Sequence, residues 1–155
     1  MKENTDRGRA SAISVDKDGK WYFEGREIIR KDILALFYEH LHQNDDGYYV
    51  EVEGDREYLE VEDTVFVVES VSLVKNGEEA FLIDLNDGTE ERLDLKTFRI
   101  TESNVPYCMV KGGKFSARFL RLPFYQLGKH AEYDEEAHEY FLLLNGEKFP
   151  LQIAS

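Results

Sequence analysis

Glycine-containing turns divide this chain into short runs in which apolar and polar residues alternate. Alternation with a period of two is typical of strands that bury one face, and Asn-Gly between two such runs is a strong hairpin signal. Asn76-Gly77 lies between TVFVVESVSLV and EEAFLIDL, and Asn145-Gly146 follows another apolar run near the carboxyl terminus. The sequence therefore predicts a fold made mainly of antiparallel sheets.

One segment near the amino terminus has helical spacing instead. Apolar residues recur there at i, i+4, i+7, i+8 and i+12, namely Ile29, Ile33, Leu36, Phe37 and Leu41. This is one face of a helix, which Asn44–Gly47 would end. His40 and His42 fall two residues apart on this predicted helix, so they point in different directions and do not form a metal site.

The carboxyl-terminal third repeats the order of the opening segment: strand, glycine turn, helix-like segment, acidic loop and hairpin. A shift of 87 residues places Gly25 on Gly112 and Phe37-Tyr38 on Phe124-Tyr125. A later shift of 92 residues aligns the two hairpins, and the change of shift falls in the acidic loop, where an insertion is tolerated,. This pattern predicts an internal duplication.

Pro123 breaks the correspondence, because it falls on Leu36 in the middle of the first helix. A proline inside a helix removes a backbone hydrogen bond, whereas the first helical position accepts it. The second helix is therefore predicted to begin near Pro123, with residues 116–122 as a separate turn or short helix.

These features predict an α+β fold of two small subdomains, each built on a strand-turn-helix-hairpin repeat. Residues 1–12 are polar and without periodicity, which indicates a disordered tail,. The first repeat subdomain is assigned to residues 13–62. The second subdomain, 63–155, combines central hairpins over 63–104 with the second repeat over 105–155.

The charge of the chain limits its partners. With 32 acidic and 19 basic residues, the net charge is −13, which disfavours DNA, RNA and anionic membrane surfaces,. A small anion could still bind in a local basic pocket. The most apolar run, Thr64–Val74, is too short to span a bilayer, and the amino terminus has no apolar signal core,. A soluble cytoplasmic protein is expected.

The motifs that carry chemistry are incomplete in this chain. VKGGKFS resembles part of a phosphate loop, but the chain has Cys108 and Phe115 where that loop needs Gly and Ser or Thr, which favours a hairpin turn,. DLNDGTEE has its glycine one position too early for a calcium loop,. The single cysteine, Cys108, excludes an intrachain disulfide and lies in an apolar strand, which indicates a buried, inert thiol,. The sequence predicts no catalytic residue, no metal ligand and no cofactor, so an enzyme is not expected.

The few basic residues gather at the starts of the two helical segments. They are Arg26, Arg30 and Lys31 before the first, and Lys111, Lys114, Arg118 and Arg121 before the second. Helix amino termini favour anions, and arginines add bidentate contacts, so both groups could line one cleft. The alternative is ordinary surface pairing with the abundant acids. Glu62 and Asp63, at a strand junction, are either capping carboxylates or a polar pair beside a groove.

Four segments together resemble a bacterial family of uncharacterised proteins, the domain-of-unknown-function family twelve-eighty-five. They are WYFEGREIIRKDILALF, DDGYY, VEDTVF and VKGGKFSARFLRLPFY, and the resemblance covers roughly residues 18–151. It implies a two-domain α+β fold with an internal duplication and a second half similar to a pleckstrin-homology fold. It also implies a site for a nucleotide-like ligand at the interface of the two halves, and a role in signalling.

The resulting hypothesis is a non-enzymatic module that binds a small anionic, nucleotide-like ligand between the halves. Trp21 and Tyr107 would stack on the base, and Glu62 and Asp63 would accept hydrogen bonds from sugar or base. The phosphate would be held by Arg30, Arg118 and Arg121. The alternative is an acidic protein–protein interaction adaptor that takes no small ligand, whose protein partner the sequence does not identify.

Overall fold

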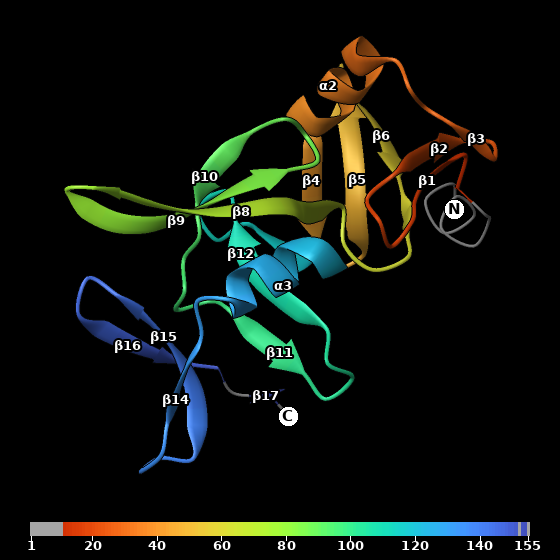
Figure 1. Ribbon diagram of the computed structural model, residues 1–155. Coiled ribbons are helices and arrows are strands. Elements are labelled where there is room, and N and C mark those ends of the chain that lie inside the picture. Colours follow the sequence, from red (N-terminus) through yellow and green to blue (C-terminus); the bar gives the residue numbers. More distant parts are fainter. Residues whose placement is uncertain (1–10, 152, 155) are drawn as a thin grey trace. The chain divides into compact units, whose positions relative to one another are not determined.

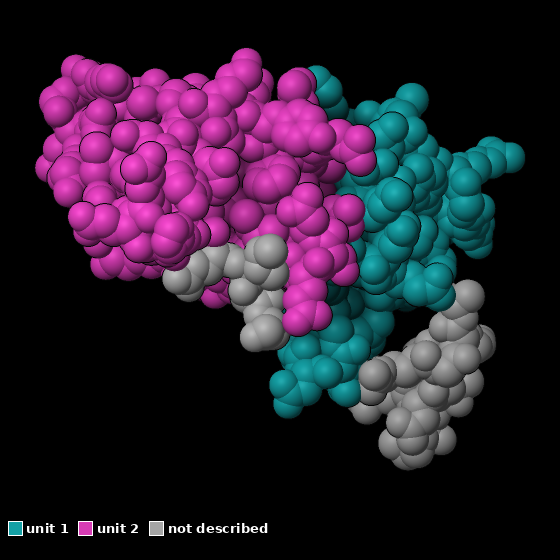
Figure 2. Space-filling view, turned by 60° about the horizontal axis from the view of Figure 1, so that its bottom comes forward, with its two compact units in different colours: residues 1–65 teal, residues 66–155 magenta. Residues whose placement is uncertain are grey.

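A computed structural model describes residues 11–151, 153 and 154 (Figure 1). The chain forms two compact units, which divide between Val65 and Phe66 (Figure 2). The subdomain boundaries expected from the sequence stay predictions, and residues 1–10 of the predicted tail fall outside the described residues.

Unit 1 contains a four-stranded sheet in the order β3-β2-β1-β7. Its strands are β1 (Ile13–Val15), β2 (Trp21–Phe23), β3 (Arg26–Glu27) and β7 (Glu60–Val61). β1 pairs antiparallel with β2 and parallel with β7, so the first and the last strand of the unit are neighbours in one sheet. Gly25, with φ at +84°, forms the tight β2–β3 turn, where a residue with a Cβ would be strained,.

Between β3 and β7 the chain forms one helix and a second sheet of unit 1. The helix is α2 (Lys31–Glu39), and the sheet has the order β4-β5-β6, with β4 (Leu41–Asn44), β5 (Gly47–Val52) and β6 (Asp55–Tyr58). The predicted helix is shorter than expected. Ile29 precedes it, His40 caps its carboxyl end, and Leu41 and His42 begin β4, because pairing with β5 outweighs the helical spacing.

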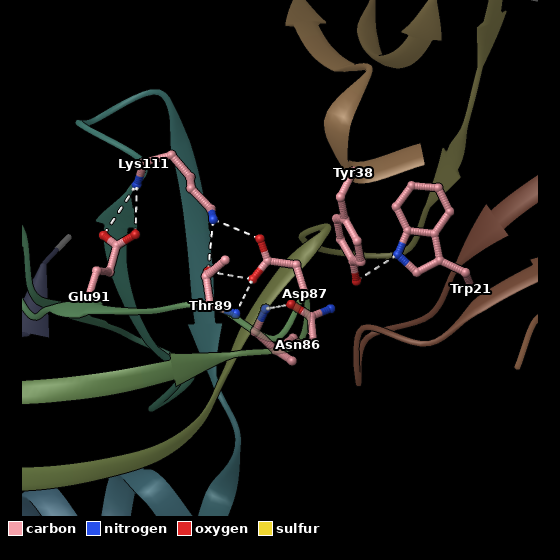
Figure 3. A network of polar contacts seen from close by, with 8 residues as sticks. Trp21, Tyr38, Asn86, Asp87, Thr89, Glu91 and Lys111 are labelled. Carbon is pink, nitrogen blue, oxygen red and sulfur yellow. Dashed lines mark hydrogen bonds and ion pairs between the residues drawn. The ribbon is translucent and has the colours of Figure 1, made fainter. Parts of the chain in front are cut away.

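The core of unit 1 is built around its tryptophan. Trp21 is only 2% exposed. Its ring stacks on Phe37 of α2 at 5.6 Å between ring centroids and meets the edge of Tyr38 at 5.2 Å. The indole Nε1 donates a hydrogen bond of 3.0 Å to the Tyr38 hydroxyl (Figure 3). These contacts fix α2 to the sheet, although no residue of the helix is itself fully buried.

Unit 2 is organised by a seven-stranded sheet in the order β10-β9-β8-β13-β12-β11-β17. Its strands are β8 (Phe66–Asn76), β9 (Glu78–Leu85), β10 (Glu90–Arg92), β11 (Arg99–Thr101), β12 (Pro106–Val110), β13 (Phe115–Phe119) and β17 (Ile153–Ala154). The predicted hairpin turns at Asn76-Gly77 and at Gly112-Gly113 are confirmed, since each joins two antiparallel neighbours. The β8–β13 and β11–β17 pairs are parallel.

The remaining elements of unit 2 are α3 (Arg121–Gly128) and a three-stranded sheet in the order β14-β15-β16. These strands are β14 (Glu132–Asp134), β15 (Glu139–Leu144) and β16 (Glu147–Pro150). The expectation for residues 116–122 is wrong, because β13 runs to Phe119 and α3 begins at Arg121. Pro123 is tolerated at the third helical position, since the first N–H groups of a helix have no partner within it.

The predicted α+β class with mainly antiparallel sheets agrees with this architecture. The likeness of the second half to a pleckstrin-homology fold stays a prediction. Among the described residues, neither the length nor the hydropathy of any helix is sufficient for it to cross a membrane.

Candidate functional site

The seven residues proposed from the sequence come from both units. Trp21, Arg30, Glu62 and Asp63 belong to unit 1, and Tyr107, Arg118 and Arg121 belong to unit 2. Of the unit 1 set, Trp21 is a core residue whose ring lies against Phe37 and Tyr38. This burial gives Trp21 a packing role in unit 1, and its assignment to base stacking has no support from its surroundings.

Arg30 lies directly before α2 and is paired. Its guanidinium bonds both carboxylate oxygens of Asp32, with Nη2 at 2.7 Å from Oδ2, and both side chains are about two-thirds exposed. The hydrogen bond from Arg30 lowers the pKa of Asp32 below its ordinary value. An anion arriving at Arg30 would have to displace this carboxylate, although a pair so exposed to solvent is weak.

Glu62 lies in an acidic pocket of unit 1 with a volume of about 500 Å³. The pocket is lined by Ser14, Val15, Asp16, Tyr22, Glu60, Val61 and Glu62. Glu62 accepts a hydrogen bond from the Lys17 amide at 3.2 Å, and Asp16 accepts one from the Tyr22 hydroxyl at 2.9 Å. That bond to Asp16 raises the pKa of Tyr22. Three carboxylates around one pocket disfavour an anion there.

Asp63 is not among the residues that line this pocket. Its charge acts on Tyr48, whose pKa is raised first by burial and then by the Asp63 carboxylate. The predicted pair of acceptors, Glu62 and Asp63, is therefore engaged within unit 1, and its contact with a ligand stays a prediction.

In unit 2 the predicted residues lie close together. Tyr107 of β12 and Arg118 of β13 are direct partners across the sheet. Arg99 of β11 is the partner of Tyr107 on its other side, with its guanidinium carbon 4.9 Å from the centre of the tyrosine ring. Direct partners project from the same face of a sheet, so Arg99, Tyr107 and Arg118 form one row. Sequence reasoning missed Arg99.

Arg118 and Arg121 line a single pocket of about 330 Å³ in unit 2. Its full lining consists of Ser103, Asn104, Val105, Pro106, Arg118, Phe119, Arg121, Phe124 and Tyr125. We call this the arginine pocket. It forms where the β11–β12 turn lies beside the junction between β13 and α3. Pairing of Tyr107 with Arg118 brings these segments together, because it sets the start of β12 against the end of β13.

The arginine pocket combines positive charge with apolar surface. Arg121 is exposed, and no ion pair of this side chain is present in the part of the chain that the structure describes. Arg121 is also the first residue of α3, whose N-cap Leu120 supplies no side-chain acceptor. The positive end of the helix therefore adds to the two guanidiniums. Within the described residues, no group of three or more His, Cys, Asp or Glu side chains could hold a metal ion.

The comparisons with known proteins bear on both units. Residues 3–64 match the family model described as the domain of unknown function DUF1285, N-terminal domain. Over these residues the chain is similar to the DUF1285 family. The resemblance noted in the sequence is thereby confirmed, and unit 1 contains the DUF1285 N-terminal domain. No curated protein matches the chain.

Two crystal structures of DUF1285 family proteins share this fold. The protein from Silicibacter pomeroyi is 22% identical, with a TM-score of 0.74, and the match covers 94% of this chain and 81% of that one. The protein from Shewanella baltica is 18% identical, with a TM-score of 0.64, and the match covers 77% of this chain and 91% of that one. The likeness to these DUF1285 proteins therefore extends into unit 2 as a likeness of fold.

Lys111, one of the other basic residues noted in the sequence before the second helix, has a structural role in unit 2. Its Nζ donates to Asp87 Oδ2 at 2.7 Å and to Thr89 Oγ1 at 2.9 Å, and its backbone N–H lies 3.3 Å from both Glu91 carboxylate oxygens (Figure 3). These bonds join the β12–β13 turn to the β9–β10 turn. Asp87 is only 8% exposed in its side chain, so its charge depends on this pairing.

Sequence reasoning missed every lining residue of the arginine pocket except the two arginines, and Asn104, Phe124 and Tyr125 are among those missed. Asn104 has a φ of +63°, which a turn imposes and which asparagine tolerates better than most residues,. A Ser-Asn pair before Val-Pro is a turn signal in the sequence, and it could have placed this residue in the turn before β12,. Phe124 and Tyr125 were noted only as a repeated dipeptide. They occupy the fourth and fifth positions of α3, whereas Phe37 and Tyr38 are the seventh and eighth of α2.

Cys108 is expected to be unreactive in the folded protein. It is fully buried in β12, as the sequence predicted, and burial, the largest influence, raises the pKa of its thiol to about 12. Since the thiolate is the reactive form, an aromatic disulfide reagent at neutral pH should not modify Cys108 until denaturant is added. Rapid modification without denaturant, followed by absorbance, would contradict this burial.

Proposed function

We propose that the chain is a non-enzymatic ligand-binding module with a role in signalling, and that the arginine pocket of unit 2 binds the anionic group of a small, nucleotide-like molecule. The observation that carries this proposal is that Arg118 and Arg121, from a strand and from the helix that follows it, line one pocket together with three aromatic residues. A guanidinium is always charged and offers a planar set of donors that matches phosphate or carboxylate geometry.

The chemistry of the remaining lining supports a ligand with a flat apolar part. Phe124 and Tyr125 supply aromatic surface and Pro106 an aliphatic ring, while Ser103 and Asn104 add polar groups. Small-molecule pockets combine aromatic and aliphatic surface with a few convergent polar groups. The arginine pocket has both kinds of lining, and the polar share is the larger. The volume of about 330 Å³ is that of a ligand the size of a mononucleotide rather than of a macromolecule,.

The contrast with unit 1 also favours this location. The unit 1 pocket is lined by Asp16, Glu60 and Glu62, which would repel the same anion,. In a chain of net charge −13, a pocket with two arginines and no lining carboxylate stands out as the place where an anion is stabilised,. Tyr107 lies beside Arg118 but not in the lining, so we assign it to supporting the arginine rather than to stacking on a base.

The proposal is tested by a thermal-shift screen with inorganic phosphate, nucleoside monophosphates and cyclic nucleotides. A ligand present at about a hundred times its Kd should stabilise the folded state by about 2.7 kcal/mol. The Arg121→Ala variant should bind about tenfold to a hundredfold more weakly, as expected for the loss of a charge-assisted hydrogen bond.

The matched control for this experiment is Arg92→Ala. Arg92 is an exposed arginine of β10, three strands away from β13 in the same sheet. Its substitution should leave the ligand-induced rise in the unfolding midpoint unchanged. If no probe raises the unfolding midpoint at millimolar concentration, the proposed ligand class is wrong. If Arg92→Ala and Arg121→Ala weaken the shift equally, the effect is one of overall charge and the proposed location is wrong.

We also propose that the two units contain an internal duplication. The strand order β3-β2-β1-β7 in unit 1 has the same form as β13-β12-β11-β17 in unit 2, and each set ends in a parallel pair. The β5–β6 pairing of Val52 with Asp55 corresponds to the β15–β16 pairing of Leu144 with Glu147 at a shift of 92 residues. A separately expressed unit 1 that folds with native circular dichroism would support a duplicated, independent module.

A further inference from the structure

Unit 2 contains two Asn-Gly pairs at hairpin tips, although Asn76 is the last residue of β8 whereas Asn145 lies in its turn with a φ of +50°. Asn76-Gly77 joins β8 to β9, and Asn145-Gly146 joins β15 to β16. In both pairs the asparagine and the glycine are exposed, and both glycines have a φ above +80°. Neither exposure nor the identity of the following residue distinguishes the two sites.

Their hydrogen bonding is different. The Asn145 side chain bonds both backbone groups of Glu79: Nδ2 donates to the Glu79 carbonyl at 2.8 Å, and Oδ1 accepts from the Glu79 amide at 2.7 Å. The Asn145 amide in turn donates to Glu79 Oε1 at 2.9 Å. In the described part of the chain, no hydrogen bond holds the side chain of Asn76.

From this contrast we propose that Asn76 is a site of spontaneous deamidation in the folded protein, and that Asn145 is protected by its bonds to Glu79. The Gly77 amide nitrogen attacks the side-chain carbonyl carbon of Asn76. A new C–N bond closes a cyclic imide, the Cγ–Nδ2 bond breaks, and ammonia leaves with the proton from the Gly77 amide. Water then opens the ring at either carbonyl, giving aspartate or isoaspartate.

The chemistry needs an accessible following amide and a side chain that is free to rotate. Glycine meets the first condition because it has no Cβ to shield its nitrogen. Asn76 meets the second because, among the described residues, no hydrogen bond holds its side-chain amide. At Asn145 the two side-chain hydrogen bonds to Glu79 must open before Cγ can approach the Gly146 nitrogen, which should slow the reaction about tenfold or more,.

The products would alter the tip of the β8–β9 hairpin. Aspartate adds a negative charge beside Glu78 and Glu79, and isoaspartate also inserts a methylene into the main chain where Asn76 pairs with Glu78. Because Glu79 is the residue that holds Asn145, the modification would strain the contact between the two hairpin tips. The chain would thus acquire a chemically aged form with a looser β15–β16 turn.

The test is incubation of the full chain in mildly alkaline buffer, followed by peptide mapping with mass spectrometry of the two sites separately. In the folded protein, Asn76 should deamidate about tenfold faster than Asn145 or more. In denaturant, where the bonds to Glu79 are absent, the two rates should agree within about twofold. The comparison isolates the effect of the fold from that of the sequence.

Two variants complete the design. Asn76→Gln should abolish the reaction at residue 76 and leave the rate at Asn145 unchanged. Glu79→Ala removes one of the three bonds to Asn145 and should accelerate deamidation there without changing the rate at Asn76. The proposal is overturned if Asn76 stays unmodified in the folded chain, or if both asparagines react at the same rate in it.

Discussion

Replacement of Trp21 by alanine is expected to lower the free energy of unfolding of unit 1 by about 3–5 kcal/mol, the range for removing a large buried aromatic side chain. Trp21 is 2% exposed, stacks on Phe37 and donates a hydrogen bond to Tyr38. Its loss would leave a cavity under α2 and remove the hydrogen bond to the Tyr38 hydroxyl at the same time. Urea denaturation followed by far-ultraviolet circular dichroism measures the change.

The matched control is Phe23→Ala, in the same strand. Phe23 is 48% exposed, so its replacement should lower the free energy of unfolding by less than about 1 kcal/mol,. Equal losses in the two variants would show that Trp21 is not the centre of the unit 1 core. A large loss of stability in Trp21→Ala would also favour the packing role of Trp21 over its predicted role in ligand stacking.

The second large effect is expected from Lys111→Met in unit 2. The substitution removes the only ion pair of Asp87 among the described residues and leaves a carboxylate that is 8% exposed. Breaking a buried pair on one side costs about 3–5 kcal/mol, and the partial exposure of Lys111 reduces this to about 2–3 kcal/mol at neutral pH. The control is Lys114→Met, at an exposed position on the same turn. It should leave the free energy of unfolding almost unchanged.

Acidification should reduce the difference in free energy of unfolding between the Lys111→Met variant and the wild type. Burial is the largest influence on Asp87 and raises its pKa, but hydrogen bonds from Lys111 and Thr89 outweigh it, so the pKa lies below the ordinary aspartate value. The wild type therefore loses this stabilisation as the pH falls through the lowered pKa. In the variant, burial acts without Lys111, the pKa of Asp87 rises, and protonation relieves the penalty at a higher pH. Unfolding midpoints of both proteins are measured across this pH range. A constant difference between the two midpoints would contradict the pairing of Lys111 with Asp87.

The hairpins of this fold could be predicted from the sequence because their signals are local. Asn76-Gly77 and Gly112-Gly113 each place a residue of positive φ between two apolar runs, and each forms the turn expected. The helix boundaries depended on distant partners instead. Leu41 continues the helical spacing of α2, but pairing with Val50 makes it the first residue of a strand. Likewise β13 is drawn into the sheet by β8, which no local pattern around residue 116 indicates.

The candidate site shows the same division. The clustering of Arg118 and Arg121 was visible in the sequence because they are three residues apart, and they do line one pocket. Asn104 joins them only through the pairing of β12 with β13, so its contribution could not be predicted from spacing. The burial of Trp21 could not be predicted for a different reason, since an aromatic residue looks the same in a sequence whether it is buried or exposed,. Its role in ligand stacking stays a prediction.

The parallel pairing of β8 with β13 has a consequence for how unit 2 folds. Phe66 pairs with Ala117, 51 residues further along the chain, whereas the β8–β9 and β12–β13 hairpins close over only a few residues. Loop-closure entropy makes the hairpins the early events and their joining the slow one. Until that step, the apolar start of β8, Phe66–Val68, has not yet paired with β13. It is during this interval, on the ribosome or after dilution from denaturant, that the chain is most exposed to self-association.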